Sequence, residues 1–418
     1  MYYIIIGAGP AGIVAAENIR KSDADADITL IGSEPEPPYS RMAIPYYLTG
    51  NIDESGSYLR TQQNHYEALN ISVVRDQVVK VEPGSQLLKL ASGKTLEYDK
   101  LLIATGSNPI RPPIPGIDLP CVQSCWTLQD GRNIIELAQS GSNVVLIGAG
   151  FIGCIILEAL VKRGVNLTVV ETGNRMVPRM LDDKAGGLLQ RWCEAKGVNV
   201  KTSAGVTAIN AVGNGATVAL DNGESFPADL VIAATGVRAN IGFLQNSGID
   251  CDQGILVDEF MQTNQPNVYA AGDVAQGYDF STGQQTVQAI QPTATDHGRI
   301  AALNMCGKKT KHHGSINMNV LDTLGLISVS FGSWMGEAGG ESVEIYNEEF
   351  FQYLNLQFSG DVLVGASATG KTQHVGVMRG LIESRIKLGE WKDRLLQDPT
   401  CLMEAYMACT QEIGFNQR

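Results

Sequence analysis

Residues 2–12 read YYIIIGAGPAG, and residues 144–153 read VVLIGAGFIG. Each stretch is a short apolar run that leads into the spacing Gly-x-Gly-x-x-Gly. Such a run followed by a glycine-rich turn predicts a buried strand, a tight bend and the start of a helix. One turn of this kind is weak evidence, but two in the same chain predict two strand–turn–helix units of one type.

The sequence after each turn continues the same pattern. The first turn is followed by a helical pattern over 12–21 and a strand pattern over 27–31, and the second by a helix over 151–163 and a strand over 166–171. Because strands alternate with helices, we expect parallel sheets. The predicted fold class is α/β, with two Rossmann-like dinucleotide-binding domains and a C-terminal α+β domain.

The first glycine-rich turn has the residues that a dinucleotide pyrophosphate requires. Its glycines permit a tight bend, a close backbone approach to the phosphates and close packing of helix on strand. The helix N-terminus adds free amides and the positive end of a dipole. A carboxylate after the next strand can accept hydrogen bonds from ribose hydroxyls. The predicted first site comprises Gly7, Gly9, Pro10, Ala11, Gly12 and Glu34.

The second turn predicts a nicotinamide nucleotide site by the same argument. Its strand ends at Glu171, where a carboxylate binds the 2′-hydroxyl of NADH and repels the 2′-phosphate of NADPH. Arg175 lies nearby and could weaken that preference, so NADPH stays open as the second choice. The predicted contacts are Gly148, Gly150, Phe151, Ile152, Gly153 and Glu171.

Residues 260–275 read FMQTNQPNVYAAGDVA, and residues 103–106 and 233–236 read IATG and AATG. Together with the two turns, these segments make the whole chain similar to the FAD/NAD(P)-binding pyridine nucleotide-disulfide oxidoreductases. The resemblance implies that Asp273 binds the ribityl chain of FAD. It further implies cofactor contacts or domain crossovers at Ala104, Thr105, Gly106, Thr235, Gly236 and Gly272.

The same resemblance implies the domain order. Residues 1–110 and 238–312 would form the FAD-binding domain, 111–237 the NAD(H)-binding domain, and 313–418 a C-terminal domain that resembles dimerising domains. A proline-rich stretch at 108–120 and a break near 307–314 agree with these boundaries. A homodimer is therefore one expectation.

Residues 38–48 read PYSRMAIPYYL and narrow the resemblance to rubredoxin reductases, the flavin module of assimilatory nitrite reductases, and the NADH oxidase and coenzyme A disulfide reductase group. Arg41 would contact the FAD pyrophosphate, a role that suits a guanidinium. Met42 stands where the disulfide reductases of this group have their redox cysteine. Because a thioether forms no thiolate, we expect no disulfide reduction at this position.

Two charges that relatives place beside the flavin are also absent. Tyr46 or a neighbour occupies the lysine position, and Ile155 the position of its glutamate partner. Phe151 and Glu158 are the candidate catalytic residues. Phe151 matches an aromatic gate over the flavin in relatives. Glu158 either replaces the missing carboxylate or is a solvated helix residue. A helix from Gln291 to about Met305 would point its N-terminus at the flavin, with contacts from Pro292 and Thr293.

The composition sets outer limits on function. The chain has 418 residues, 44% hydrophobic and 18% charged, with a net charge of −13. This charge disfavours nucleic acid and anionic membranes as partners. No apolar run is long enough to span a bilayer, and the eight scattered cysteines suit reduced thiols in a cytoplasmic protein without a metal site. Residues 365–372 fit a phosphate-loop pattern, but lack the surrounding parallel sheet.

The resemblance predicts an FAD-dependent NADH oxidoreductase. NADH would deliver a hydride to the flavin, which would pass electrons to an acceptor such as a small rubredoxin or iron–sulfur protein. Two alternatives remain: an FAD-binding subunit or sensor with impaired reduction by NADH, and an NADH oxidase that uses dioxygen.

Overall fold

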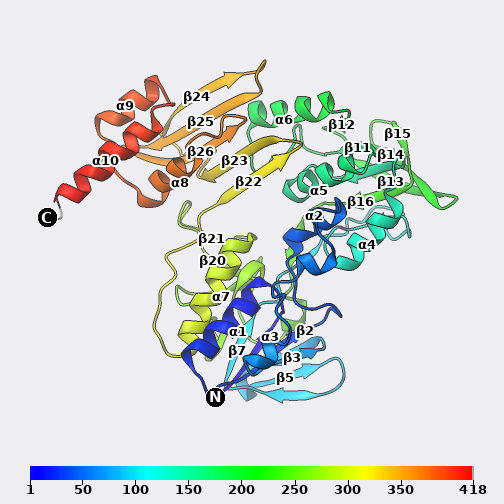
Figure 1. The fold of residues 1–418 in the computed structure, drawn as a ribbon, viewed down its shortest axis with the longest axis vertical. Helices are drawn as coiled ribbons and strands as arrows, with labels where there is room; N and C mark the ends of the chain where they lie inside the picture. Colours follow the sequence, from blue (N-terminus) through cyan, green and yellow to red (C-terminus); the bar gives the residue numbers. More distant parts are fainter. Residues whose placement is uncertain (417–418) are drawn as a thin grey trace. The chain divides into compact units, whose positions relative to one another are not determined.

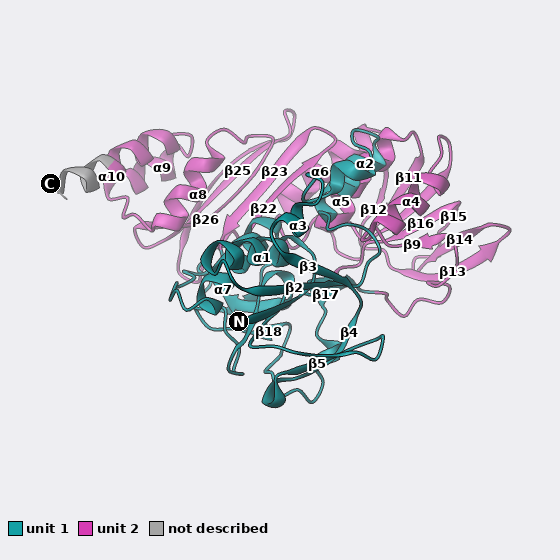
Figure 2. Ribbon diagram, turned by 60° about the horizontal axis from the view of Figure 1, so that its bottom comes forward, with its two compact units in different colours: residues 1–110, 237–315 teal, residues 111–236, 316–418 magenta. Residues whose placement is uncertain are grey.

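The computed structural model describes residues 1–416, with side chains through residue 410. The chain divides into two compact units, each of which is described by itself (Figure 1, Figure 2). Unit 1 comprises residues 1–110 and 237–315, and unit 2 comprises residues 111–236 and 316–418. Both contain a five-stranded parallel sheet with helices, which confirms the predicted α/β class.

All the strands in the sheet of unit 1 are parallel. The first apolar run of the chain forms its central strand. Tyr2 pairs with Asp27 on one side of this strand, and Tyr3 with Lys100 on the other. In spatial order the strands are β19 (Val268–Ala270), β7 (Lys100–Ile103), β1 (Tyr2–Ile6), β2 (Asp27–Gly32) and β3 (Ile71–Arg75).

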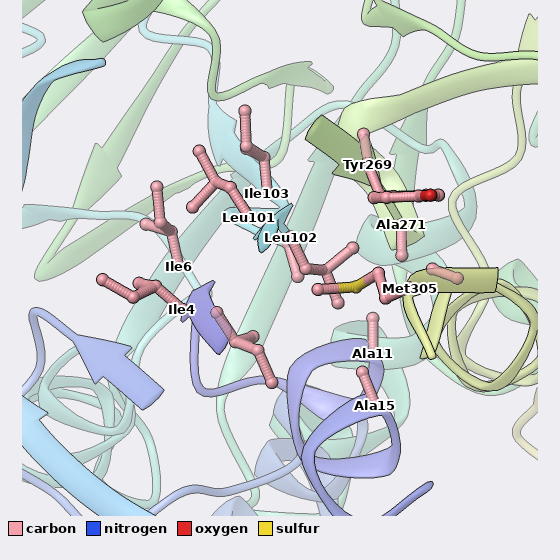
Figure 3. Close-up of a cluster of buried hydrophobic side chains, with 14 of the residues drawn as sticks. Ile4, Ile6, Ala11, Ala15, Leu101, Leu102, Ile103, Tyr269, Ala271 and Met305 are labelled. Atoms are coloured by element: carbon pink, nitrogen blue, oxygen red, sulfur yellow. The ribbon is translucent and has the colours of Figure 1, made fainter. Parts of the chain in front are cut away.

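Two helices from distant parts of the sequence pack together beside this sheet. They are α1 (Pro10–Ser22) and α7 (Gln291–Met305). A Cβ at Gly298 of α7 would lie 2.3 Å from the carbonyl oxygen of Ala11, so only glycine permits this approach. Figure 3 shows the buried side chains of the core, among them Ile4, Leu102 and Met305.

The remaining elements of unit 1 are short. An antiparallel pair joins the strands that lead out of the unit and back into it, β8 (Ser107–Pro109) and β17 (Val237–Ala239). The other strands are β4 (Val78–Glu82), β5 (Leu87–Leu90), β6 (Thr95–Glu97), β18 (Ile255–Leu256), β20 (Ala275–Tyr278) and β21 (Gln285–Val287). The helices are α2 (Ile44–Leu48), α3 (His65–Ala68) and the 3₁₀ turns η1 (Arg41–Ala43), η2 (Glu54–Ser57), η3 (Pro83–Ser85), η4 (Gly242–Leu244) and η5 (Gly272–Val274).

Unit 2 repeats the architecture around the second glycine-rich turn. Its parallel sheet has the order β12 (Asn199–Lys201), β11 (Asn166–Val170), β10 (Asn143–Ile147), β16 (Leu230–Ala233) and β9 (Val122–Gln123). The helices are α4 (Leu128–Leu137), α5 (Phe151–Lys162) and α6 (Asp183–Ala195), and an antiparallel ribbon consists of β13 (Val206–Val212), β14 (Gly215–Leu220) and β15 (Ser225–Ala228).

The C-terminal part of unit 2 is an antiparallel sheet with three helices. Its strands follow the order β22 (Met318–Thr323), β23 (Leu326–Gly332), β26 (Val362–Thr369), β25 (Gln352–Ser359) and β24 (Glu341–Asn347), and its helices are α8 (Val375–Ser384), α9 (Glu390–Gln397) and α10 (Leu402–Asn416). The phosphate-loop pattern at 365–372 lies largely in β26 and opens no helix, since α8 begins only at Val375. Within residues 1–416, no helix is long and apolar enough to cross a membrane.

Candidate cofactor sites

The first glycine-rich turn has the shape of a pyrophosphate cradle. A Cβ at Gly7 would lie 2.1 Å from the Ala104 carbonyl oxygen, and one at Gly12 would lie 2.0 Å from the Gly7 carbonyl oxygen. A Cβ at Gly9 would meet no atom within 4 Å. Gly7 and Gly12 are thus required by the protein itself, whereas Gly9 faces open space at the N-terminus of α1, where a phosphate would approach. Pro10 and Ala11 form the first turn of this helix.

The structure brings Glu34 and Arg41 together. Arg41 Nη2 donates to Glu34 Oε1 at 2.6 Å, and Arg41 Nη1 donates to the Tyr39 hydroxyl at 3.0 Å. The Tyr39 hydroxyl in turn donates to the other Glu34 oxygen. Both predicted contacts are therefore parts of one polar cluster at the end of β2. An ionised carboxylate has several acceptor sites, so this cluster fits a ribose as a further donor.

The predicted ribityl contact, Asp273, lies in η5 beside the first turn. Its carboxylate accepts a hydrogen bond of 3.2 Å from the Ser107 hydroxyl. Burial raises the pKa of Asp273, and both the Ser107 hydrogen bond and the charge of Arg41 oppose that rise. Gly272 has φ +76°, and a Cβ there would lie 3.2 Å from the Ala11 Cβ. The turn and the FAD-like segment thus meet, although they are over 250 residues apart.

The second turn repeats the geometry of the first. A Cβ at Gly148 would lie 2.5 Å from the Ala234 carbonyl oxygen, and one at Gly153 would lie 2.2 Å from the Gly148 carbonyl oxygen. At Gly150 it would meet nothing within 4 Å. Gly150 precedes α5, whose first residues are Phe151 and Ile152. This turn therefore fits a second pyrophosphate in the same way.

Glu171 follows β11 and is buried, with 8% of its surface exposed. Its Oε2 accepts a hydrogen bond of 2.8 Å from the Ala149 amide, and its Oε1 accepts one of 2.7 Å from the Gly173 amide. The Ala149 carbonyl accepts a further bond of 2.8 Å from the Val177 amide. The carboxylate and the loop after it thus hold Ala149, the residue between the first two glycines of the turn, at both its amide and its carbonyl.

The structure gives Arg175 other partners than a nucleotide phosphate. Its Nε donates to the Leu181 carbonyl at 2.8 Å and its Nη2 to the Pro178 carbonyl at 3.2 Å. Nη1 forms an ion pair of 2.8 Å with Asp183. The guanidinium therefore closes the loop between β11 and α6 on itself.

Three residues singled out in the sequence lie along one face of α5. Phe151, Ile155 and Glu158 are spaced four and three residues apart, as neighbours on a helix surface are. Glu158 Oε1 pairs with Lys162 at 2.5 Å, and its Oε2 accepts from the Leu324 amide at 3.2 Å. These contacts join α5 to the β22–β23 turn. Glu158 is therefore not a solvated helix residue, and its predicted role beside the flavin stays a prediction.

The other predicted contacts lie at the ends of strands and helices. In unit 1, Ala104 follows β7, Thr105 donates to the Asn240 carbonyl at 3.0 Å, and Gly106 has φ +64°. Pro292 and Thr293 form the first turn of α7, next to Gln291, which accepts a bond of 2.6 Å from Ser40. In unit 2, Thr235 and Gly236 follow β16.

The cysteines have the properties of structural thiols. Burial raises the pKa of Cys121, Cys125, Cys154, Cys193, Cys251, Cys306 and Cys401, to about 12 at Cys125 and Cys193. A raised pKa disfavours the thiolate that disulfide chemistry needs. Met42, at the redox-cysteine position, is exposed. Among the described residues, no group of three or more acidic, histidine or cysteine side chains could hold a metal ion.

Sequence reasoning missed four residues that shape these sites. They are Tyr39, which completes the Glu34 cluster; Ser107, which binds Asp273; Val177, which holds Ala149; and Asp182, which caps α6. Only Asp182 had a local signal, because an aspartate before a helical pattern is a typical N-cap.

The two glycine turns, the carboxylate after each second strand and the Asp273 segment make this an α/β protein with two candidate dinucleotide sites. The family model of the pyridine nucleotide-disulphide oxidoreductases matches residues 1–298. The chain belongs to this family, whose members bind FAD and NAD(P)H, and the predicted superfamily and oxidoreductase class are confirmed.

Individual relatives cover much of the chain. It is 32% identical over 413 residues to NADH-dependent phenylglyoxylate dehydrogenase subunit epsilon of Aromatoleum evansii, a match that covers 98% of this chain and 97% of that protein. It is 29% identical over 313 residues to rubredoxin-NAD(+) reductase of Pseudomonas putida, with coverages of 74% and 81%. The structure of an NAD-dependent persulfide reductase from A. fulgidus superposes with a TM-score of 0.86 at 27% identity, covering 93% of this chain and 78% of that one.

Proposed function

We propose that the chain is an FAD-dependent NADH oxidoreductase that passes electrons to a separate redox protein. The observation that carries this proposal is the repeated turn geometry, in which Gly9 and Gly150 face open space while their neighbouring glycines are sterically required. When bound, FAD accepts a hydride from NADH and releases electrons one at a time. The residues of the chain bind and orient the two dinucleotides, with FAD in unit 1 and NADH at the second turn.

Two features of unit 2 support NADH over NADPH. Glu171 is a buried carboxylate at the end of β11, where it would repel a 2′-phosphate. Arg175, the candidate that the sequence offered to attract that phosphate, is bonded to Asp183 and to two carbonyls of its own loop. The loop would have to open before this cation reached a nucleotide.

The acceptor is proposed from the relatives and from what the chain lacks. One relative, the rubredoxin-NAD(+) reductase of Pseudomonas putida, has a small redox protein, rubredoxin, in its name. The raised pKa values of seven cysteines disfavour the thiolate that disulfide reduction needs, and Met42 cannot form one. A one-electron protein acceptor is therefore the best-supported outlet.

Anaerobic mixing of the FAD-containing protein with NADH tests the proposal. Rapid bleaching of the flavin absorbance, followed by its recovery on addition of oxidised rubredoxin or ferredoxin, is expected. A flavin that stays oxidised contradicts the reductase and favours the second candidate, an FAD-binding subunit that receives electrons elsewhere. The full-length match to the epsilon subunit of another dehydrogenase is the observation that favours this candidate.

The NADH oxidase alternative has a separate test. In air, the reductase is expected to consume oxygen much more slowly than it reduces a protein acceptor. Oxygen uptake at the same rate as NADH oxidation, with no acceptor present, would identify an oxidase instead.

A further inference from the structure

We propose that the C-terminal sheet positions the NADH-binding loop of unit 2 through Tyr353 and Asp182, which makes Tyr353 a positioning residue for NADH. The inference rests on the proposed function, because it assumes that NADH binds at the turn of residues 148–153. It goes beyond that function by giving the C-terminal domain a part in nucleotide binding. All the residues involved belong to unit 2.

The loop in question is residues 172–182, which we call the β11–α6 loop. It starts beside Glu171, whose carboxylate holds the Ala149 amide, and the Val177 amide returns to the Ala149 carbonyl at 2.8 Å. The position of the loop therefore determines where the central peptide of the glycine turn lies. A displaced loop would change the geometry offered to a pyrophosphate.

Val177 shows that the loop does not adopt its shape for local reasons. It is a β-branched residue with φ +50°, in the left-handed region that such side chains disfavour. Its side chain is nevertheless buried, with 1% exposed. A strained backbone of this kind persists only where the surroundings over-determine it, so contacts from outside the loop are expected to hold it.

Asp182, the last residue of the loop, makes such a contact. Its Oδ1 accepts from the Ala185 amide at 2.9 Å and so caps α6. Its Oδ2 accepts a hydrogen bond from the Tyr353 hydroxyl of β25. One carboxylate thus joins the loop, the start of α6 and the C-terminal sheet.

The Tyr353 hydroxyl is itself fixed from behind. Asn355 Nδ2 donates to it at 2.9 Å, and Gln357 Nε2 donates to Asn355 Oδ1 at 2.6 Å. Tyr353 is fully buried, and both burial and the hydrogen bond to Asp182 raise its pKa, so it remains a neutral donor at any physiological pH. Three side chains on alternate positions of β25 thus form a hydrogen-bonded row, Gln357, Asn355 and Tyr353. The Tyr353 hydroxyl at the end of this row donates to Asp182 of the loop.

Other contacts join α6 to the C-terminal part of unit 2, from the first turn of the helix to its last. Lys184 pairs with Glu344, Arg191 Nη2 donates to the Tyr346 hydroxyl at 2.9 Å, and Trp192 Nε1 donates to the Leu324 carbonyl at 3.2 Å. These contacts hold the body of the helix. Substitution of Tyr346 provides a matched control for substitution of Tyr353, because the two tyrosines are directly paired across β24 and β25.

The test compares Tyr353→Phe with Tyr346→Phe in the FAD-containing full-length protein. NAD⁺ is the probe for calorimetric titration, since it shares the adenosine and pyrophosphate of NADH and does not reduce the flavin. Loss of one hydrogen bond to a carboxylate predicts a Kd about 3- to 10-fold higher for Tyr353→Phe. The KM for NADH should rise in parallel while kcat with ferricyanide stays within about twofold, because the bond lies outside the reacting groups.

Amide hydrogen exchange gives a readout that does not depend on turnover. The Val177 amide should exchange faster in Tyr353→Phe than in Tyr346→Phe, because its hydrogen bond to the Ala149 carbonyl depends on the position of the loop. A second variant, Asp182→Asn, keeps one oxygen for the cap of α6 but places an amide NH₂, a donor, where the second oxygen accepts from Tyr353, so it should weaken NAD⁺ binding to a similar extent. If Tyr353→Phe folds poorly, this variant carries the test.

The outcomes separate the two proposals. Wild-type protein that binds no NAD⁺ contradicts the proposed function. Wild-type protein that binds NAD⁺, with Tyr353→Phe and Tyr346→Phe indistinguishable in Kd and in Val177 exchange, overturns only the role of Tyr353. An equal loss of affinity in both tyrosine variants also overturns it, because the effect would then belong to domain packing in general.

Discussion

The carboxylate of Glu171 and the backbone amide of Ala149 are joined by a buried hydrogen bond of 2.8 Å that spans 22 residues of sequence. Its second oxygen holds the Gly173 amide at 2.7 Å. Glu171 is therefore a structural part of the glycine turn as well as the proposed contact of a ribose. One residue couples the shape of the phosphate cradle to the recognition of the sugar.

Replacement of Glu171 by alanine should cost stability even without nucleotide. It leaves two backbone amides without their acceptor, and a buried unsatisfied donor costs about 1–3 kcal/mol. We expect a clearly lower melting temperature for Glu171→Ala and a loss of NADH affinity. Glu224→Ala, which removes an exposed partner of Lys201, is the control and should melt like the wild type. Equal melting temperatures for the two variants would argue against the structural role.

Alanine substitutions in the first turn should separate folding from FAD binding. Gly9→Ala adds a methyl group into open space at φ −83°, so the protein should fold but retain little FAD after purification. Gly12→Ala places the same group 2.0 Å from the Gly7 carbonyl oxygen and should give mostly insoluble protein. Absorbance of bound flavin and circular dichroism measure the two effects. A flavin-saturated Gly9→Ala protein would show that the phosphates lie elsewhere.

Arg175→Ala should weaken NADH and NADPH together. The guanidinium closes the β11–α6 loop through the Leu181 and Pro178 carbonyls and is paired with Asp183. Its removal should loosen the loop and raise both dissociation constants about 3- to 10-fold. The ratio of the two constants should change by less than about twofold. A selective loss of NADPH binding would instead identify Arg175 as a phosphate contact.

His297 should make unit 1 sensitive to acid. It is buried in α7 with its ring edge-on to His312 and its Nε2 3.2 Å from the Ser315 hydroxyl. Burial, followed by the charge of His312, lowers the pKa of His297 from 6.5 to about 3, while Asp296 opposes that shift. The unfolded chain therefore binds a proton that the folded one does not between pH 6.5 and 3. Stability should fall as the pH falls, by about 3 kcal/mol between pH 7 and 4.

The comparison of His297→Gln with wild type isolates this contribution. Melting temperatures from pH 7 to 4 should fall less steeply in the variant, because its side chain does not titrate. His65→Gln, which alters a partly exposed histidine beside Glu17, serves as the control for the loss of a histidine. Parallel pH profiles for His297→Gln and wild type would contradict the buried neutral histidine.

The sequence predicted the two parallel units closely because their signals are local. The helix predicted from Gln291 to about Met305 runs over those residues, and the strand predicted over 27–31 is longer by one residue. Glycine spacing and apolar runs act within about ten residues. Such patterns are visible without knowledge of the fold.

The C-terminal domain was predicted less completely. Strand β24 and helix α8 were missed, since residues 341–347 alternate polar and apolar side chains weakly, and α8 starts at Val375 after a cap residue, His374, in the left-handed conformation. The pairs Glu34–Arg41 and Asp273–Ser107 were missed for another reason. Glu34 and Arg41 lie in one irregular segment after β2, where no helix or strand period predicts which side chains meet, whereas Ser107 and Asp273 are 166 residues apart and meet only in the folded unit.

The order of strands in unit 1 has a consequence for biosynthesis. Its sheet is completed by β19, and α1 packs against α7, which ends at Met305. A ribosome that has made residues 1–110 must therefore add nearly 200 more before this half can close, roughly 10–40 s at ordinary elongation rates. The residues between, 111–236, emerge first as a complete sheet. The parallel sheet in the middle of the chain is thus placed to finish folding before the sheet of the unit that begins it.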